Sequence, residues 1–357
     1  MVTAVSGLTA MDKYADKEFS PWYEGSVFGS DAARALLRYV VDSRITFSGY
    51  SYLAERTTEL EARAMIDDLV RQTISNEEEY PGTLKRNVIT LGYMSHAPLG
   101  ISQDSDPNAD FKVLMHMQME TIATDPAVFG VYGMLWYYSP YVNEEYLRWA
   151  GRMFRHFGIE GNTAPLTTDP YVLSHIKNGD FKQGTEGWVI HEAQPGSVTV
   201  NQMAGYGMMQ NRYPAGPKGN TFLLMKRSEK GPNSFSQEMK GLETGRLYSM
   251  RMITADHGNI TAQNSVNQQD VVSIQLDGVE LEAQAGKNTQ ETYKSTRYIG
   301  QFTQDQPAWL NFHWYIFRAK GTSARLQVSD WASADAPGGP IGQELMVNFV
   351  EVQPYLE

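Results

Sequence analysis

Several residue types and patterns are missing from this chain of 357 residues. It contains no cysteine, which excludes disulfide bonds, thiolate metal sites and cysteine nucleophiles. No apolar run approaches the ~20 residues that a helix needs to cross a bilayer. Residues 1–19 also lack the basic region followed by an apolar core that marks a signal peptide.

Two common classes of site leave no sequence signature here. Neither a G-x-G-x-x-G nor a Walker phosphate loop occurs, so a nucleotide-binding site has no support. The chain has seven histidines, but none forms an H-E-x-x-H pair, so a catalytic zinc site has no support either.

The net charge of −11 is distributed unevenly. Residues 1–170 contain 14 basic and 23 acidic side chains, and the remainder contains 16 and 18. Neither half has a basic face for phosphate groups, so we expect no binding to nucleic acid or to anionic membranes. The near-neutral second half is rich in aromatic residues and suits a neutral ligand such as a sugar.

In the first half, a short apolar run is followed by a helical pattern four times. The predicted strands are residues 2–8, 44–50, 87–93 and 129–136, and the predicted helices are residues 31–42, 57–74, 110–124 and 143–157. This alternation favours parallel strands joined by right-handed crossovers. A complete (β/α)8 barrel needs about 250 residues, so four units indicate a half barrel or the C-terminal portion of one. A doubly wound open sheet is the alternative.

Candidate reactive residues follow from this arrangement, because barrel enzymes carry them just after the strand ends. We predict Glu55 and Glu144 as the catalytic carboxyl groups, since sugar hydrolysis needs two of them about 5–10 Å apart. His96, Trp136 and Tyr138 are predicted sugar contacts. The plainer interpretation of both glutamates is that they occupy the first turn of a helix, where the dipole favours a carboxylate. Three apolar residues of the last predicted helix are spaced four positions apart on one helical face, so we expect them to be buried: Trp149, Met153 and Phe157.

The second half consists of short strands separated by turn residues, without helices between them. The predicted strands are residues 197–200, 221–225, 248–255, 270–275, 279–283, 308–317, 324–328 and 344–352. This pattern predicts an antiparallel β-sandwich. The pair Asp277-Gly278 is a typical two-residue hairpin turn and predicts that the strands on either side of it pair with each other.

A family resemblance begins at Asn178-Gly179-Asp180-Phe181, followed by Gly184-x-x-Gly187-Trp188. This pattern, with the segments 242–248 and 347–352, resembles galactose-binding-like jelly-roll domains, which include many carbohydrate-binding modules. The resemblance implies a sandwich domain at 178–357 after a linker at 163–177, with the βα domain at 1–162. The segment 130–140 resembles the closing unit of barrel glycoside hydrolases.

The resemblance also implies a structural calcium ion between the first turn and the last strand. Asp180 is the matching ligand in the opening turn. An acidic residue is usual in the closing strand, but this chain has Asn348 there. The alternative is that Asp180 only caps its turn.

Aromatic residues in the second half are candidates for stacking against a sugar. Tyr213, Trp309 and Tyr315 are the predicted contacts, with further candidates at Tyr206, Trp314 and Trp331 and polar partners at Gln210, Arg212 and Asn311. By strand alternation, Trp309 and Tyr315 share a face with Asn311 and His313, which we expect to be the wetter face. Trp314 shares the other face with Leu310, Phe312 and Ile316 and is expected inside.

Together these features predict a carbohydrate-active, glycoside-hydrolase-like chain with an appended carbohydrate-binding module. The alternative is a non-catalytic carbohydrate-binding or assembly protein. Four βα units leave two open sheet edges, so we expect a homo-oligomer or another association that closes them. A carbohydrate partner implies an extracellular or periplasmic location.

Overall fold

The computed structural model describes residues 47–50, 74, 77–78, 81–82, 84–91, 111–126, 129, 133–136, 144–166, 175–211, 219–282 and 289–355. The chain divides into two compact units, an α/β unit and a β-sandwich unit. Residues 167–174, in the middle of the predicted linker, lie outside the described part. The predicted domain boundaries therefore stay a prediction.

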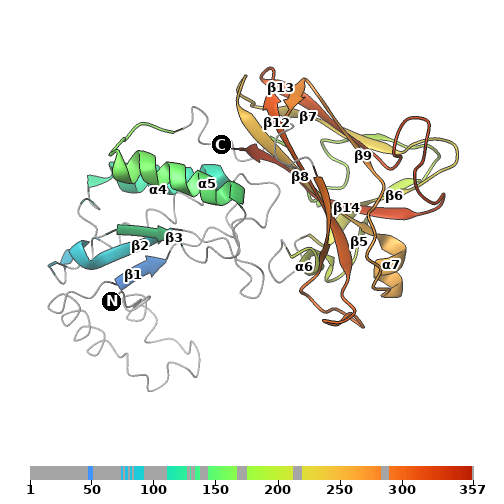
Figure 1. The fold of residues 1–357 in the computed structure, drawn as a ribbon, viewed down its shortest axis with the longest axis horizontal. Coiled ribbons are helices and arrows are strands. Elements are labelled where there is room, and N and C mark those ends of the chain that lie inside the picture. The colour runs from blue at the N-terminus through green and yellow to red at the C-terminus, as the bar shows by residue number, and fades with distance from the viewer. Residues whose placement is uncertain are drawn as a thin grey trace. The chain divides into compact units, whose positions relative to one another are not determined.

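The described strands of the α/β unit form a parallel sheet (Figure 1). β1 (Phe47–Tyr50), β2 (Asn87–Leu91) and β3 (Gly133–Trp136) lie in this order. A 3-10 turn, η1 (Leu84–Arg86), leads into β2. Sequential parallel strands are the arrangement that the alternating pattern predicted. The first predicted strand and helix, residues 2–8 and 31–42, lie outside the described residues, so closure into a half barrel stays a prediction.

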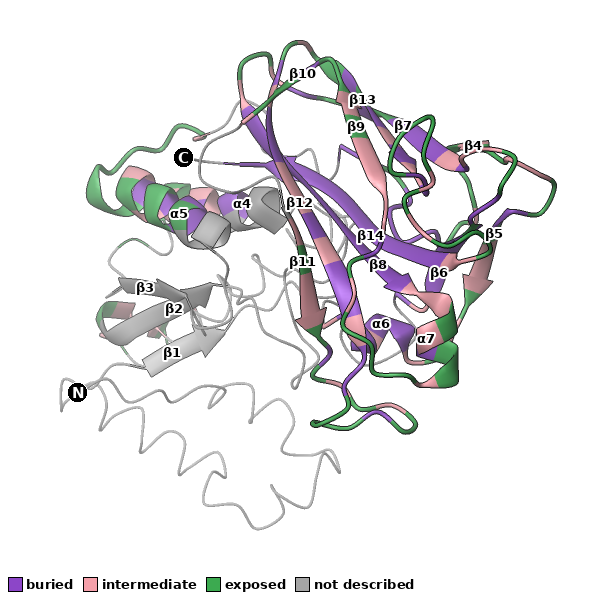
Figure 2. Ribbon diagram, turned by 45° about the vertical axis from the view of Figure 1, so that its right-hand side comes forward, coloured by how far each residue is buried: buried purple, intermediate pink, exposed green. Residues whose placement is uncertain are grey.

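Two helices lie on one face of this sheet in both views, α4 (Phe111–Thr124) and α5 (Glu144–Met153) (Figures 1 and 2). α5 continues as a π-helix, η4 (Phe154–Ile159). The predicted helix core is confirmed, since Trp149, Met153 and Phe157 are buried. His116 of α4 packs edge-on against the Phe157 ring and accepts a hydrogen bond from the Leu166 amide at 2.8 Å.

The predicted antiparallel β-sandwich is present. Its larger sheet has the order β10-β12-β8-β14-β6-β5, with β11 also paired to β12, and its smaller sheet has the order β4-β7-β13-β9. The strands are β4 (Val189–His191), β5 (Val198–Gln202), β6 (Thr221–Lys226), β7 (Ser234–Lys240), β8 (Leu247–Asp256), β9 (Ser273–Asp277), β10 (Val279–Leu281), β11 (Thr289–Lys294), β12 (Trp309–Ala319), β13 (Ser323–Ser329) and β14 (Glu344–Pro354). The expectation of no helices between the strands is wrong, because two short helices lie among them, α6 (Tyr206–Met209) and α7 (His257–Ala262).

Side chains that alternate along the strands form the core between the sheets. Tyr248, Met250 and Met252 of β8 pack in one cluster with Leu326 and Val328 of β13. A second cluster includes Ile253 and Ala255, which lie further along β8 and point to its opposite face, with Tyr206 of α6 and Ile260 of α7. Both faces of β8 are therefore covered, and Figure 2 shows β8 and β14 as mostly buried.

The hairpin predicted at Asp277-Gly278 is wrong. β9 pairs with β13 in the smaller sheet, whereas β10 pairs with β12 in the larger one. The two residues form a corner that carries the chain from one sheet to the other. Gly278 has φ of 81°, which suits a tight turn. Local turn chemistry is the same for both outcomes, and only the distant strands β12 and β13 decide between them.

The prediction of a wetter face on β12 is also wrong. Asn311 and His313 are only 2% and 1% exposed. Tyr315, on the same face, packs partly buried against the main core. The alternation was correct, but that face points between the sheets. Trp314, on the opposite face, is half-buried beside the buried Ile316.

Candidate functional site

The opening turn of the sandwich, residues 178–188, is built around Asn178. Its side-chain amide donates to the carbonyls of Gly184 and Glu186, both at 3.0 Å, and its oxygen accepts from the Gln183 amide at 3.0 Å. The Asn178 carbonyl accepts from the Trp188 indole at 3.0 Å. Asn178 itself has φ of 54°, a conformation that asparagine tolerates better than most residues.

This turn lies against the last strand, because the Gly179 carbonyl accepts from the Val350 amide at 2.9 Å. Asp180 is buried and its carboxylate accepts from the Lys182 amide at 3.3 Å. The described residues fit calcium poorly. The Asn348 side chain donates to the carbonyls of Gly219 and Thr221 and accepts from the Phe349 amide. No cluster of three metal-ligating His, Asp or Glu side chains occurs among the described residues. Calcium at Asp180 stays a prediction.

The site residues predicted in the α/β unit lie at, or follow in sequence, the C-terminal ends of its parallel strands. Tyr50, Leu91 and Trp136 are the last residues of parallel strands, so the chain leaves the sheet at the same edge three times. Trp136 ends β3 and Glu144 begins α5. The other predictions that follow this edge lie outside the described residues: Glu55, His96 and Tyr138.

Three remote segments meet at one end of the sandwich, which we call the α6–β11–β12 corner (Tyr206, Gln210, Asn211, Tyr293, Lys294, Thr296 and Trp309). The Asn211 amide donates to the Lys294 carbonyl at 3.1 Å, and its oxygen accepts from the amide and the hydroxyl of Thr296, both at 3.0 Å. The Tyr293 hydroxyl donates to the Gln210 carbonyl at 2.9 Å. The corner thus unites α6 with the end of β11.

Trp309 completes the corner from β12, where it pairs directly with Lys294 of β11. The Trp309 side chain is half-buried, and the Lys294 ammonium group lies 5.6 Å from the centre of its ring. A cation at this distance is attracted to the electron-rich face of an indole. Tyr213, predicted as a sugar contact, lies outside the described residues, but Asn211 just before it is held at this corner.

Among the predicted candidates, Tyr206 begins α6, Gln210 follows it and Trp309 begins β12. The Tyr206 ring packs in the cluster that contains Leu310, whereas Trp309 belongs by strand alternation to the other face of β12, with Asn311 and His313. The sequence analysis did not identify the other four residues of this corner as candidates: Asn211, Tyr293, Lys294 and Thr296. These residues carry no local signal, because their place depends on the pairing of β11 with β12. Trp331, another candidate, is buried two residues after the end of β13, a strand of the smaller sheet.

A buried polar chain lies on the inner face of the larger sheet. The Thr254 hydroxyl donates to Asp270 Oδ2 at 2.8 Å and accepts from His313 Nε2 at 2.9 Å. Burial raises the pKa of Asp270 to about 6 and lowers that of His313 to about 3. The Asp270 amide donates to Asn311 at 3.1 Å. These contacts hold the segment before β9 against β8 and β12, so we assign them a structural role.

Arg227, the residue after β6, joins three loops through its hydrogen bonds. Its guanidinium donates to the carbonyls of Asp330 and Val271, both at 2.8 Å, and to the Gln343 side chain. Gly339 lies so close to this guanidinium that a Cβ atom there would overlap it. Each nitrogen of the guanidinium group donates within the protein, so the group anchors loops rather than a ligand.

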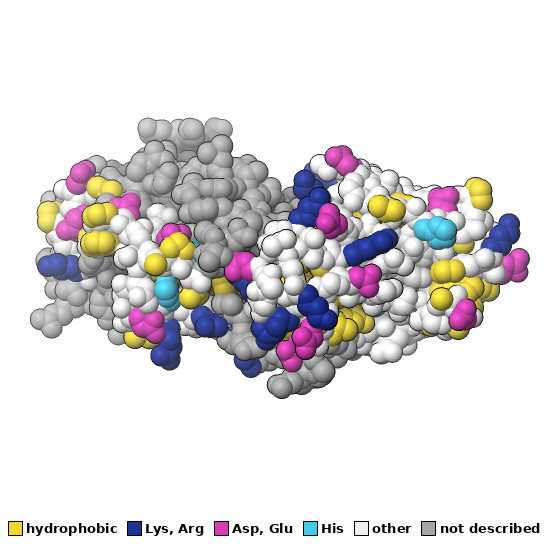
Figure 3. Space-filling model, turned by 90° about the horizontal axis from the view of Figure 1, so that it is seen from above, with side chains coloured by type: hydrophobic (Ala, Val, Ile, Leu, Met, Phe, Trp, Pro, Cys, Tyr) yellow, Lys and Arg dark blue, Asp and Glu magenta, His cyan; other side chains and the backbone are white. Residues whose placement is uncertain are grey.

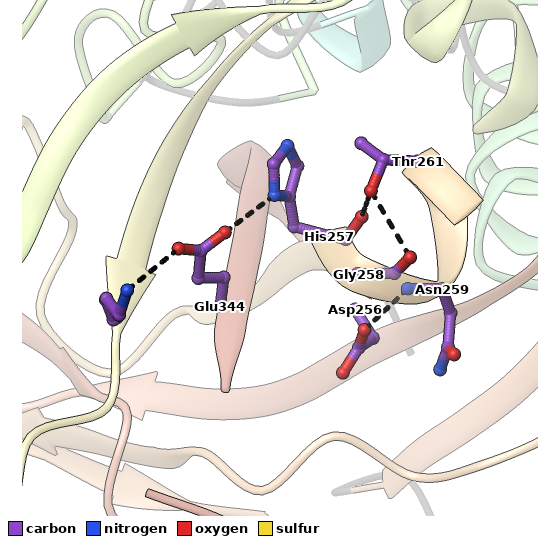
Figure 4. A network of polar contacts seen from close by, with 7 residues as sticks. Asp256, His257, Gly258, Asn259, Thr261 and Glu344 are labelled. Atoms are coloured by element: carbon purple, nitrogen blue, oxygen red, sulfur yellow. Dashed lines mark hydrogen bonds and ion pairs between the residues drawn. The ribbon is translucent and has the colours of Figure 1, made fainter. Parts of the chain in front are cut away.

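A third polar network joins β8, α7 and β14 (Figure 4). The Asp256 carboxylate caps α7 by accepting from the Asn259 amide at 2.8 Å. His257 Nδ1 and Glu344 Oε2 are 2.8 Å apart, and Lys226 Nζ lies 3.4 Å from Glu344 Oε1. The hydrogen bond from His257 lowers the pKa of Glu344. All three side chains are partly exposed, and such surface pairs contribute little energy.

In the described part of the chain, no helix has the length and apolar character to cross a membrane. No family model matches the sequence, and no curated protein matches it. Three solved structures illustrate the folds to which it is similar. The active domain of Bacteriophage CBA120 tailspike protein 4 aligns at 9% identity and a TM-score of 0.30, over 51% of this chain and 21% of the tailspike chain.

The other two are smaller proteins. TmCBM61 in complex with β-1,4-galactotriose aligns at 14% identity and a TM-score of 0.27, over 50% of this chain and 97% of its own. A putative sugar-binding protein from Bacteroides thetaiotaomicron aligns at 9% identity and a TM-score of 0.27, over 51% and 99%. Each alignment covers about half of this chain, and this chain spans about a fifth of the tailspike structure.

Proposed function

We propose that the β-sandwich unit binds a neutral carbohydrate at the α6–β11–β12 corner. The observation that carries this proposal is the half-buried Trp309 ring with the Lys294 ammonium group 5.6 Å from its centre. An indole offers a flat apolar surface for the C–H face of a sugar ring. The ammonium group of Lys294 beside it can donate hydrogen bonds to sugar hydroxyls.

The charge distribution supports a neutral ligand. Residues 171–357 are close to neutral, and Figure 3 shows acidic and basic side chains interspersed over the face that it displays. Such a surface attracts neither polyanions nor polycations strongly. A polysaccharide partner accords with an extracellular or periplasmic location, which we include in the proposal.

If a carbohydrate binds at this corner, its affinity should depend on Trp309. Trp309→Ala removes the stacking surface and should raise the Kd for a bound polysaccharide at least tenfold, or about 1.4 kcal/mol. Trp309→Phe keeps a ring and should retain most of the affinity. Galactan, xylan and mixed-linkage β-glucan are suitable neutral probes, measured by affinity electrophoresis and then by calorimetry.

Val189→Ala is the matched control for this experiment, because Val189 is 67% exposed on β4 of the other sheet. Its Kd should equal that of the unchanged protein. Equal Kd values for Trp309→Ala and Val189→Ala would remove the corner from carbohydrate binding. Absence of binding to every neutral polysaccharide tested would contradict the proposed function itself.

Hydrolysis of the bound carbohydrate is the second candidate function. It is favoured by the parallel strands β1, β2 and β3, whose C-terminal ends share one edge. In this proposal Glu55 and Glu144 are the acid and its partner carboxylate, and His96, Trp136 and Tyr138 contact the sugar. A protein that binds without hydrolysis, and associates with copies of itself through the α/β unit, is the remaining alternative.

A further inference from the structure

Two dipeptides of this chain are prone to a spontaneous rearrangement of the backbone, Asn178-Gly179 and Asp277-Gly278. In each, the glycine nitrogen can attack the side-chain carbonyl carbon of the residue before it, because glycine has no side chain that hinders the approach. Asparagine normally reacts faster than aspartate, since the carboxylate that aspartate carries at neutral pH is a poor electrophile. By local chemistry alone, Asn178 is therefore the first residue expected to change.

The opening turn protects Asn178 from this reaction. The residue is buried, and its amide nitrogen donates to the carbonyls of Gly184 and Glu186, both at 3.0 Å. Its side-chain oxygen accepts from the Gln183 amide at 3.0 Å. Ring closure needs this amide group to rotate and its nitrogen to leave as ammonia, so all three bonds must break first. The turn must open before Asn178 reacts, and the rate falls in proportion to the population of the open form.

Asp277 has the opposite surroundings. Both Asp277 and Gly278 are exposed at the corner between the two sheets. The hydrogen bond that the structure gives the Asp277 carboxylate comes from Nε2 of Gln275 at 3.0 Å, an exposed side chain of the same strand. Exchanging such a contact for water costs little free energy. The carboxyl group can therefore turn toward the glycine nitrogen while the sandwich stays folded.

We propose that Asp277 isomerises to isoaspartate in the folded protein while Asn178 is preserved, the reverse of the order that local chemistry favours. First, the Gly278 nitrogen bonds to the side-chain carbon of the protonated Asp277 carboxyl group, and the amide proton leaves with the hydroxyl group as water. Then one water adds and breaks the bond between this nitrogen and the main-chain carbonyl carbon. The chain now runs through the former side chain, and the former main-chain carbonyl is a carboxyl group.

The product lengthens the backbone by one methylene group at a corner that is packed on two sides. The Gly278 carbonyl accepts from the Lys320 amide at 3.1 Å, and the next residue, Val279, lies in the main core. A Cβ atom on Gly278 would lie 3.5 Å from the Cα atom of Ala324 in β13. A longer backbone should therefore displace the corner and weaken the pairing of β10 with β12.

The effect should be confined to stability. β10 pairs with the last residues of β12, whereas Trp309 is the first residue of that strand. The isomerised protein should therefore have a lower Tm and the same Kd for a carbohydrate as the unchanged protein. Isomerisation itself does not depend on the proposed carbohydrate binding.

Incubation of the whole protein at neutral pH for several weeks, followed by peptide mapping, tests this site. Labelling with protein isoaspartate methyltransferase should mark the peptide that contains Asp277. Deamidation of Asn178 should be at least about 100-fold slower in the native protein than in protein held unfolded in guanidinium chloride. The isomerised fraction, separated by chromatography, should melt at a lower temperature than the protein before incubation.

Asp277→Glu is the matched control, because glutamate keeps the charge but its longer side chain closes the ring far more slowly. This variant should gain no label at position 277 and should keep its Tm throughout the incubation. The proposal is overturned if the native protein gains no label at Asp277 while the unfolded protein does, or if native Asn178 converts before Asp277. Absence of carbohydrate binding contradicts only the proposed function.

Discussion

At the scale of single residues, Asp270 and His313 respond to burial in opposite ways. Burial disfavours the charged form of each, which raises the pKa of the acid to about 6 and lowers that of the base to about 3. The bond from Thr254 and the Arg227 charge oppose the shift of Asp270, and Asp256 adds to it. Both side chains meet at the Thr254 hydroxyl.

These shifts oppose each other in their effect on stability. Between pH ~4 and ~6, native Asp270 keeps a proton that the unfolded chain loses, so its contribution falls as the pH rises. Between pH ~3 and ~6.5, the unfolded chain protonates His313 while the native protein does not, so that contribution rises with pH. The two slopes overlap and largely cancel in the unchanged protein.

Asp270→Asn should expose the histidine's contribution. On acidification from pH 6 to pH 4, this variant should lose roughly 2–3 kcal/mol more stability than the unchanged protein. Urea unfolding at intervals across this range measures the difference in slope. Asp335→Asn is the control, since Asp335 is exposed. Parallel curves for Asp270→Asn and the unchanged protein would show that Asp270 titrates normally.

At the scale of elements, the opening turn closes the sandwich by joining its first residues to β14. Five hydrogen bonds involve Asn178, three of them its side chain and two its carbonyl, and the turn also bonds to Val350 of the last strand. Phe181 and Trp188 stack with ring centres 5.4 Å apart beneath it. Turn chemistry and core packing therefore support the same conformation.

Asn178→Gly should destabilise the sandwich by about 2–4 kcal/mol, because three side-chain hydrogen bonds are lost while glycine still permits a positive φ. Asn178→Ala should cost about 1 kcal/mol more through backbone strain. Chemical denaturation followed by tryptophan fluorescence reports both. Lys182→Ala, at an exposed position of the same turn, should stay within about 0.5 kcal/mol of the unchanged protein. A comparable loss in that control would show that any change in this turn is disruptive.

At the scale of the whole molecule, the second candidate function assigns hydrolysis to the α/β unit and binding to the sandwich unit. If Glu55 acts as an acid or nucleophile, Glu55→Gln should reduce release of reducing ends at least 100-fold, since general acid–base groups contribute about that much. The Kd for the same polysaccharide should not change, because the α6–β11–β12 corner is intact. Glu229→Gln, at an exposed site in the sandwich, is the control.

Full activity in Glu55→Gln would exclude Glu55 from the reaction. Binding without any hydrolysis by the unchanged protein would favour the non-catalytic alternative, and sedimentation would then test the predicted self-association.

Several elements were predictable because their signal is local. The strands expected at 44–50, 87–93 and 129–136 contain β1, β2 and β3, and the helix expected at 110–124 differs from α4 by one residue. Apolar periodicity and capping residues act over a few positions, so they are readable in one dimension.

The sequence by itself determined the change from strands alternating with helices to a β-sandwich, and the turn at Asn178. The short helices α6 and α7 and the strands β4, β7 and β11 were not predicted. Only the tertiary structure decided that Asp277-Gly278 is a corner between sheets, that Asn311 and His313 face inward, and that α6 meets β11 and β12. The physical reason is that strand pairing and the direction of a face depend on partners tens of residues away. Local propensity is the same for either choice, and packing against those partners selects one.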